Sequence, residues 1–313
     1  MDEFSIIDKY FTGIGFQHPS VVVGSGDDCA VLKQHTDFEL CTSTDTLISG
    51  VHFPVDCSGA IVAHRSLVAN LSDLCAMGAS PVSFLLSLTM PEAINSWLSC
   101  FADRLSELSK LHQIMLVGGN IAKGPLAVTI TVLGTVPRGA ALLRSSAKVD
   151  EAIFVTGELG MAAAGLKVVE EQLNTHNLLK SAYFYPSPQV EFAESLIGRA
   201  SACIDISDGF LADLSHLCED SGIGAEIETS DIFLSDSLCA YAGSEALDFA
   251  LYGGDDYELC FSVPACFVDD IRKLALIKKT RISQVGSTIA KKGISLIKDG
   301  QKIAADVKGY THF

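Results

Sequence analysis

The chain has 313 residues, of which 48% are hydrophobic and 19% charged, and its formal net charge is −16. This composition can fill one large or two smaller hydrophobic cores and is unlike that of a disordered chain. An acidic chain without a basic stripe is not expected to bind nucleic acid, and no apolar run approaches the about 20 residues that span a bilayer. The N-terminal sequence MDEFSIIDKYF is acidic where a signal peptide is basic, so we expect a cytoplasmic protein with no membrane partner.

Strand-like and helix-like patterns alternate along the first half of the chain. They predict, in order, a short helix near 4–10, strands around 30–32 and 39–43, a helix over 60–77, a strand over 82–88, a helix over 92–111, and strands over 114–117 and 127–136. The helix over 60–77 has the clearest end, because Gly78 and Pro81 follow it as stop signals.

The pattern restarts after the turn sequence Pro137-Arg138-Gly139. The second half predicts a strand over 152–157, helices over 160–173 and 190–197, a strand over 202–206, a helix within 208–222, a strand over 258–263, a helix over 268–276, and strands over 282–285 and 294–297. Alternation of this kind implies sheets covered by helices. We place the domain boundary between Pro137 and Asp150, which gives domains 1–140 and 141–313.

Ten cysteines occur along the chain, but none forms a C-x-x-C pair. Zinc sites need closely spaced ligands, and disulfide scaffolds are usually small secreted chains. Most of these cysteines have apolar neighbours, so we expect reduced, buried thiols.

Clustered carboxylates are the main functional signal. Acidic residues stand beside small residues in five motifs, GSGDDCA (24–30), STDTL (43–47), NLSDL (70–74), DISDG (205–209) and GGDDYEL (253–259). Like charges gathered in one place are destabilising unless a cation lies between them. The sequence has no P-loop, no kinase HRD or DFG motif, no HExxH motif and no calcium-loop spacing, so none of these explains the carboxylates.

Single motifs also have structural interpretations. Asp208 is placed to cap the helix that follows it, and Asp45 fits a turn. Asp73 is more telling, because it lies in the apolar helical segment LVANLSDLCAM, where an unpaired charge is costly, and shares a helix face with Asn70. Magnesium prefers oxygen ligands and commonly combines carboxylates with substrate phosphates. Together the motifs predict magnesium ions between the protein and ATP, an arrangement suited to phosphoryl transfer.

With these motifs in order, the chain resembles the thiamine-monophosphate kinase family, within the superfamily of aminoimidazole ribonucleotide synthetase and selenophosphate synthetase. The resemblance covers nearly the whole chain and is carried by GDDCA, STDTLISGVHF, NLSDLCAMGA, GGNIAKGP, CIDISDG, GGDDYELCF and KGYTHF. It implies a two-domain α+β / α/β fold. The N-terminal α+β domain would have a mixed sheet, bind metal and ATP, and form a homodimer. The C-terminal α/β domain, of the aminoimidazole ribonucleotide synthetase type, would complete the active site.

The resemblance also implies an activity, which is ATP-dependent phosphorylation of thiamine monophosphate to thiamine diphosphate by direct in-line transfer, with no protein nucleophile. The implied ligands of several Mg²⁺ ions are Asp28, Ser43, Thr44, Asp45, Asp73, Asn120, Asp205 and Asp208. The residues implied to contact ATP are Gly119, Asn120, Arg144 and Ser207. Those implied to hold thiamine monophosphate are His52, Asp255 and Tyr310. A requirement for K⁺ stays open.

Two positions depart from the family pattern, and two other functions remain open. The family's GGD motif reads GGN here, so Asn120 offers an amide oxygen in place of a carboxylate, and we expect one Mg²⁺ to bind more weakly. Asp255 stands where glutamate is often found, which shortens its reach by one methylene. The alternatives are another ATP-using enzyme of the superfamily, and a Mg²⁺- and nucleotide-binding regulatory protein that has lost turnover through Asn120.

Overall fold

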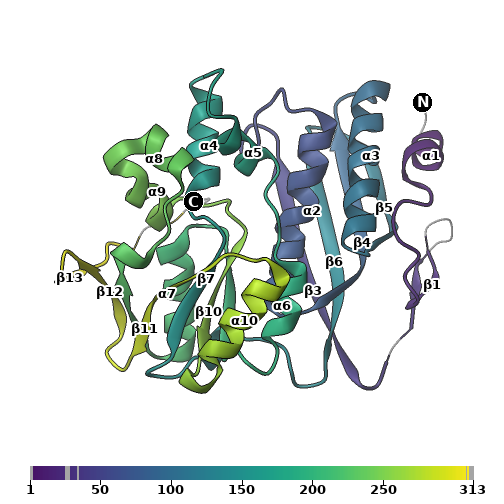
Figure 1. The fold of residues 1–313 in the computed structure, drawn as a ribbon. Helices are drawn as coiled ribbons and strands as arrows, with labels where there is room; N and C mark the ends of the chain where they lie inside the picture. The colour runs from purple at the N-terminus through teal and green to yellow at the C-terminus, as the bar shows by residue number, and fades with distance from the viewer. Residues whose placement is uncertain (1–2, 25–28, 34, 308, 310–313) are drawn as a thin grey trace. The chain divides into compact units, whose positions relative to one another are not determined.

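Figure 1 shows the computed structural model of the chain, which describes residues 3–24, 29–33, 35–307 and 309. Contacts divide the chain into two compact units. Unit 1 comprises residues 1–74 and 79–139, and unit 2 comprises residues 75–78 and 140–313. Each unit has its own sheet and its own helices.

Unit 1 is built on a four-stranded mixed sheet in the order β3-β6-β4-β5. Its strands are β3 (Phe38–Ile48), β4 (Ser80–Met90), β5 (Met115–Lys123) and β6 (Ala127–Pro137). β6 pairs antiparallel with β3 and β4, whereas β4 and β5 are parallel. Val128, Ile130 and Val132 of β6 are fully buried while the alternate residues are half-buried, so one face of the sheet carries the core. The helices α2 (Gly59–Ala76) and α3 (Asn95–Leu111) cover this face (Figure 1).

The N-terminal segment packs beside the edge strand β5. It forms α1 (Glu3–Ile6), the π-helical turn η1 (Ile7–Phe11), and the two short antiparallel strands β1 (Val21–Val23) and β2 (Val31–Leu32). Phe11 is buried in edge-to-face contact with Phe101 of α3, and Gly15 bridges to Met115 of β5. These contacts attach the segment to both α3 and the edge of the sheet.

Unit 2 is built on a seven-stranded sheet in the order β13-β12-β9-β11-β7-β10-β8. Its strands are β7 (Ala152–Thr156), β8 (Ala202–Ile206), β9 (Gly224–Glu228), β10 (Glu258–Val263), β11 (Ile282–Ile289), β12 (Gly293–Lys298) and β13 (Gln301–Ala304). Its α-helices are α4 (Met161–Glu170), α5 (Asn177–Phe184), α6 (Val190–Leu196), α7 (Phe210–Ser221), α8 (Asp236–Ala242), α9 (Ala246–Tyr252) and α10 (Val268–Lys278). The pair β9–β12 is parallel and the other pairs of this sheet are antiparallel.

Both faces of the unit 2 sheet are buried. Val155 of β7 belongs to a core shared with α7, whereas its neighbour Phe154 belongs to a second core shared with α6 and α10. Successive side chains of a strand point to opposite faces, so helices are needed on both sides. The expectation of sheets covered by helices, in a two-domain α+β / α/β fold, is confirmed.

Several sequence expectations are corrected in detail. α5, α8, α9, β1, β9 and β13 were not expected, and β5 runs on through Gly118 and Gly119 to Lys123. The ten cysteines are free thiols, but Cys29, Cys100, Cys239 and Cys266 are exposed, so the expectation of burial is wrong for them. Within the described part of the chain, none of the helices combines the length and apolar character needed to cross a membrane.

Candidate functional site

The acidic residues of unit 1 meet where β3 faces α2. Ser43 and Asp45 pair with fully buried residues of β6, so their side chains share the helix-covered face of the sheet. Ser43 Oγ donates a hydrogen bond of 2.5 Å to Asp73 Oδ2 of α2. The Asp45 N–H donates to Asn70 Oδ1 at 3.1 Å, and Asn70 Nδ2 donates to the Ser66 carbonyl at 3.0 Å. Asn70 and Asp73, the polar pair expected on one face of this apolar helix, therefore lie against the STDT segment of β3. This contact brings together oxygen atoms that could bind a metal ion.

Thr44 and Asn120 lie apart from this cluster. The Thr44 hydroxyl donates to the Ile130 carbonyl at 3.1 Å and lies 2.9 Å from Thr131 Oγ1, on the opposite face of the sheet from Asp45. Asp45, Ile130, Leu86 and Gly119 form one row across all four strands. Three inter-strand spacings separate Asp45 from Gly119, which is about 14 Å. The predicted ATP motif GGN and the acidic β3–α2 cluster thus lie at opposite edges of the sheet.

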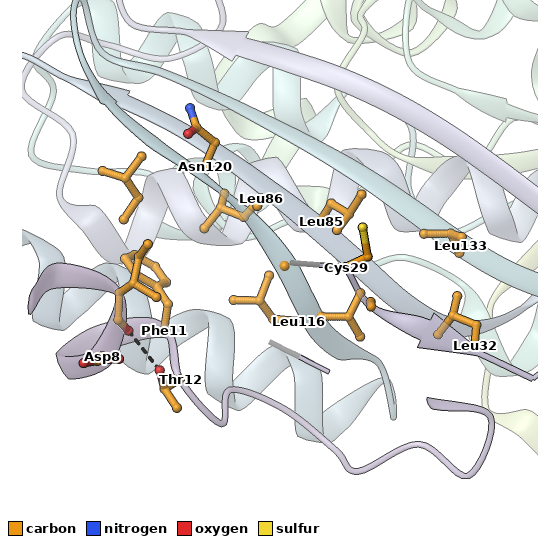
Figure 2. Close-up of a pocket in the computed structure, with 16 residues that line it drawn as sticks. Asp8, Phe11, Thr12, Cys29, Leu32, Leu85, Leu86, Leu116, Asn120 and Leu133 are labelled. Carbon is orange, nitrogen blue, oxygen red and sulfur yellow. Dashed lines mark hydrogen bonds between the residues drawn. The ribbon is translucent and has the colours of Figure 1, made fainter. Parts of the chain in front are cut away.

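A cavity of about 820 Å³ lies between β5 and the N-terminal segment (Figure 2). Its walls are mostly apolar and include Leu32, Leu85, Leu86, Leu116 and Leu133. Asp8, Phe11 and Thr12 of the N-terminal segment line another part of it, and Gly119 and Asn120 also contribute. Its volume falls in the usual range of small-molecule sites.

His52 lies in the turn after β3. Its Nδ1 accepts a hydrogen bond from the Ile48 N–H at 3.0 Å, and its carbonyl accepts one from Arg65 at 3.3 Å. Arg65 is only 1% exposed in α2, and sequence reasoning did not select it although it is a cation in an apolar helix. Asp28 and Tyr310, predicted as a metal ligand and a substrate contact, lie outside the described residues.

In unit 2 the DISDG motif forms the end of β8 and the turn into α7. Asp205 is 8% exposed, and Ser207 and Asp208 are half-buried. Gly209, not Asp208, is the N-cap of α7, and no side chain caps the helix there. The capping interpretation of Asp208 is therefore wrong.

Asp213, which sequence reasoning missed, holds this turn in place. Its Oδ2 accepts the N–H groups of Ser207, Asp208 and Gly209 at 3.0, 3.1 and 3.2 Å. Burial and the nearby Asp205 and Asp208 charges raise the pKa of Asp213 to about 7, against the effect of these N–H donors. The charges of Asp205 and Asp208 thus act on Asp213 near the start of α7, and like charges placed near one another are unfavourable.

The GGDDYEL motif packs backbone against backbone on the DISDG turn. The Asp255 N–H donates to the Ser207 carbonyl at 2.8 Å. A Cβ at Gly254 would lie 2.4 Å from that same carbonyl, and one at Gly209 would lie 2.7 Å from the Tyr252 carbonyl, so only glycine fits at both positions. The structure therefore brings together a predicted substrate residue, Asp255, and a predicted ATP residue, Ser207.

Arg144 lies away from this junction. It begins the 3₁₀ turn η2 (Arg144–Ser146), where its exposed side chain is 3.9 Å from Asp220 and its carbonyl accepts a hydrogen bond from Ser221 Oγ. Asp220 and Ser221 end α7, whereas Ser207 precedes its start. A helix of this length spans about 18 Å, so the structure does not bring Arg144 together with Ser207.

The predicted carboxylate ligands are thus divided between the units, with Asp45 and Asp73 in unit 1 and Asp205 and Asp208 in unit 2. Among the described residues, no three His, Cys, Asp or Glu side chains are grouped closely enough to hold a metal ion. Each unit has an acidic cluster of its own.

Residues 26–136 match the N-terminal domain model of the AIR synthase related proteins, and residues 148–299 match their C-terminal domain model. The thiamine-monophosphate kinase of Salmonella typhimurium is 39% identical, over 99% of this chain and 98% of its own length. The chain belongs to the thiamine-monophosphate kinase family. The Bacillus subtilis thiamine-monophosphate kinase is 32% identical, with both chains fully covered. The resemblance drawn from the sequence is confirmed.

Solved structures of this family share the fold. The thiamine-monophosphate kinase of Stenotrophomonas maltophilia K279a superposes with a TM-score of 0.87 at 36% identity, over 92% of this chain and 93% of the other. AaThiL, in a complex with AMPPCP and TMP, superposes with a TM-score of 0.80 at 28% identity, over 90% and 89% of the two chains. The fold class expected from the sequence is therefore confirmed.

Proposed function

We propose that the chain transfers the terminal phosphoryl group of ATP to thiamine monophosphate, giving ADP and thiamine diphosphate. The observation that carries this proposal is the hydrogen bond between Asp255 of the substrate motif and Ser207 of the nucleotide motif. It fixes the two motifs against each other, as transfer between two bound phosphates requires. The binding of AMPPCP and TMP together by AaThiL supports the same pair of ligands.

The donor set of the two acidic clusters fits Mg²⁺, which prefers oxygen ligands. Ser43, Asp45 and Asp73 would hold ions in unit 1, and Asp205 and Asp208 would hold ions in unit 2. The Thr44 hydroxyl is hydrogen-bonded to β6, so Thr44 can add only its main-chain oxygen to this set. Asn120 can add its amide oxygen. Asp28 is a further predicted ligand. When bound, Mg²⁺ supplies the positive charge that lets two phosphorylated molecules approach each other.

The protein's own groups then have binding and orienting roles. The acceptor is a phosphate oxygen that is already ionised near neutral pH, since the second pKa of a phosphate monoester is about 6. No protein base or nucleophile is required, and we propose direct in-line transfer. Asp213 holds the Ser207–Asp208 turn, while His52, Asp255 and Tyr310 bind the substrate.

The cavity beside β5 is where we place the base of ATP. Gly119 and Asn120 line it, and its leucines offer the apolar walls that a purine ring favours. β5 is an edge strand of its sheet, and Gly15 bridges to it at Met115. Beyond Met115, the backbone groups on the outer side of β5 can form hydrogen bonds with the base.

We also propose a homodimer formed through the uncovered face of the unit 1 sheet. This face carries Thr42, Thr44 and Thr46 of β3 with exposed Leu40 and Leu85. Ligands of one Mg²⁺ ion lie within about 2.1 Å of it, so Asn120 and Asp45, at opposite edges of the sheet, do not share an ion within one chain. An ion held by both residues would require Asn120 from a second copy of the chain. The cytoplasmic location and a K⁺ requirement stay predictions.

The test is a coupled assay for thiamine diphosphate formation with purified protein, ATP, thiamine monophosphate and Mg²⁺. Product that depends on all three additions is the expected result. ATP consumption with a different acceptor, in a panel of phosphorylated and carboxylated compounds, identifies another enzyme of the superfamily. ATP binding without ADP formation identifies the regulatory alternative. Either result refutes the proposal.

A further inference from the structure

The turn that carries Asp255 has an unusual backbone. Asp255 has a φ of +69° and Tyr257 a φ of +52°, both in the left-handed region that residues with side chains rarely adopt. Glycine would adopt these angles at less cost, yet both positions carry side chains. Such conformations persist where the surroundings hold them, and they cluster at functional sites.

Three sets of hydrogen bonds hold this turn. The Tyr257 N–H donates to the Ile206 carbonyl at 2.8 Å, next to the bond from Asp255 to Ser207. Between them, the two side-chain oxygens of Asp256 accept the N–H groups of Gly160 and Ala162 at the start of α4, at 2.6 and 3.1 Å. The turn is therefore fixed to both β8 and α4.

This backbone brings the Tyr257 side chain onto Asp255. Tyr257 Oη donates a hydrogen bond of 3.0 Å to Asp255 Oδ1, and the tyrosine is only 8% exposed whereas the aspartate is half-buried. We infer that Tyr257 is a positioning residue for thiamine monophosphate, a role that rests on the proposed function of Asp255. It fixes the plane of the Asp255 carboxylate so that an oxygen points towards the cationic thiazolium or the aminopyrimidine of the substrate.

The reason is the freedom of an aspartate side chain. A carboxylate rotates about its terminal bond, and this freedom is lost when the carboxylate binds a ligand. A buried donor that already holds one oxygen removes that loss, and a hydrogen bond to an ionised group is stronger than one between neutral groups. The side chain of Asp255 is one methylene shorter than that of a glutamate, so its contact with the substrate depends more strongly on how the carboxylate is oriented.

The experiment is a double-mutant cycle read by calorimetric Kd for thiamine monophosphate in the presence of Mg²⁺, which needs no turnover. Tyr257→Phe keeps the ring and is expected to weaken binding about fivefold. In an Asp255→Asn background the same change is expected to matter less than about twofold, because Tyr257 acts through Asp255. Kd for ATP stays unchanged in both cases.

Tyr241→Phe is the matched control, because Tyr241 Oη donates to Glu171 at 3.2 Å in the same unit, away from the substrate motif. Equal losses from Tyr257→Phe in both backgrounds, or a loss of ATP affinity of the same size, would show a merely structural role and overturn the inference. Unchanged substrate binding by Tyr257→Phe would overturn it too. Wild-type protein that binds no thiamine monophosphate instead refutes the proposed function itself.

Discussion

Asp213→Ala is the substitution that tests most directly how the predicted metal-binding turn of unit 2 is held. The alanine removes the single oxygen that accepts the N–H groups of Ser207, Asp208 and Gly209. At about 1 kcal/mol for each bond, the free energy of unfolding should fall by about 3 kcal/mol. Asp213→Asn can keep an oxygen at the same place without the charge, so its cost should be only about 1 kcal/mol.

The assay is urea unfolding of both variants, followed by the Mg²⁺ dependence of the kinase rate. Because the turn also positions Asp208, the Mg²⁺ concentration at half-saturation should rise more for Asp213→Ala than for Asp213→Asn. Glu219→Ala, an exposed residue on the same helix, is the control and should change stability by less than about 0.5 kcal/mol. An Asp213→Ala variant as stable as this control, with an unchanged Mg²⁺ requirement, would refute the reasoning.

Two further substitutions test charge at particular positions. Asn120→Asp restores a carboxylate, so the Mg²⁺ concentration for half-maximal activity should fall, and an unchanged value contradicts a ligand role for this position. Burial raises the pKa of Asp256 to about 8 from 3.8, against its hydrogen bonds from Gly160 and Ala162. The folded protein then keeps a proton on Asp256 that the unfolded chain loses, so this residue's contribution to the free energy of unfolding should fall as pH rises from about 5 to 8, by at most about 1.4 kcal/mol per pH unit. Asp256→Asn cannot ionise, so urea unfolding across this range should show a flatter slope, and a slope equal to that of the wild type would count against the shift.

The sequence predicts the long, regular elements well and the short ones poorly. The helix expected over 60–77 is observed as Gly59–Ala76, because its apolar residues follow the helical period and Gly78 follows its end. β5 extends six residues beyond its predicted end at 117, because Gly118 and Gly119 interrupt the apolar pattern. Gly119 is nevertheless required there, since a Cβ would lie 1.8 Å from the Leu86 carbonyl of the neighbouring strand. That close approach depends on a partner strand far away in the chain.

Sequence patterns likewise predict only part of the candidate site. The residues of the contact between Ser43 and Asp73 could be selected from local patterns. One pattern is a strand with polar residues on one face, and the other is an apolar helix with a polar pair on one face. Asp213 and Tyr257 were missed because their roles depend on turns whose shape no local pattern specifies. Asp213 did carry one signal, a carboxylate on the apolar face of FLADLSHL, which requires buried hydrogen-bond donors.

The proposed dimer makes a prediction about the unit 1 sheet, where the acidic β3–α2 cluster and the GGN motif lie at opposite edges. Asp45 and Gly119 occupy one row of the sheet but opposite edge strands, about 14 Å apart. If a second copy brings its GGN strand to the β3–α2 cluster, a mixed dimer of Asp45→Asn and Asn120→Trp chains has both substitutions at one site and neither at the other. Random pairing then restores about a quarter of wild-type activity from two inactive proteins, as two-fold symmetry requires. No recovery in mixed dimers that are shown to form would mean that each chain uses its own GGN motif, with one extended ATP molecule spanning the sheet.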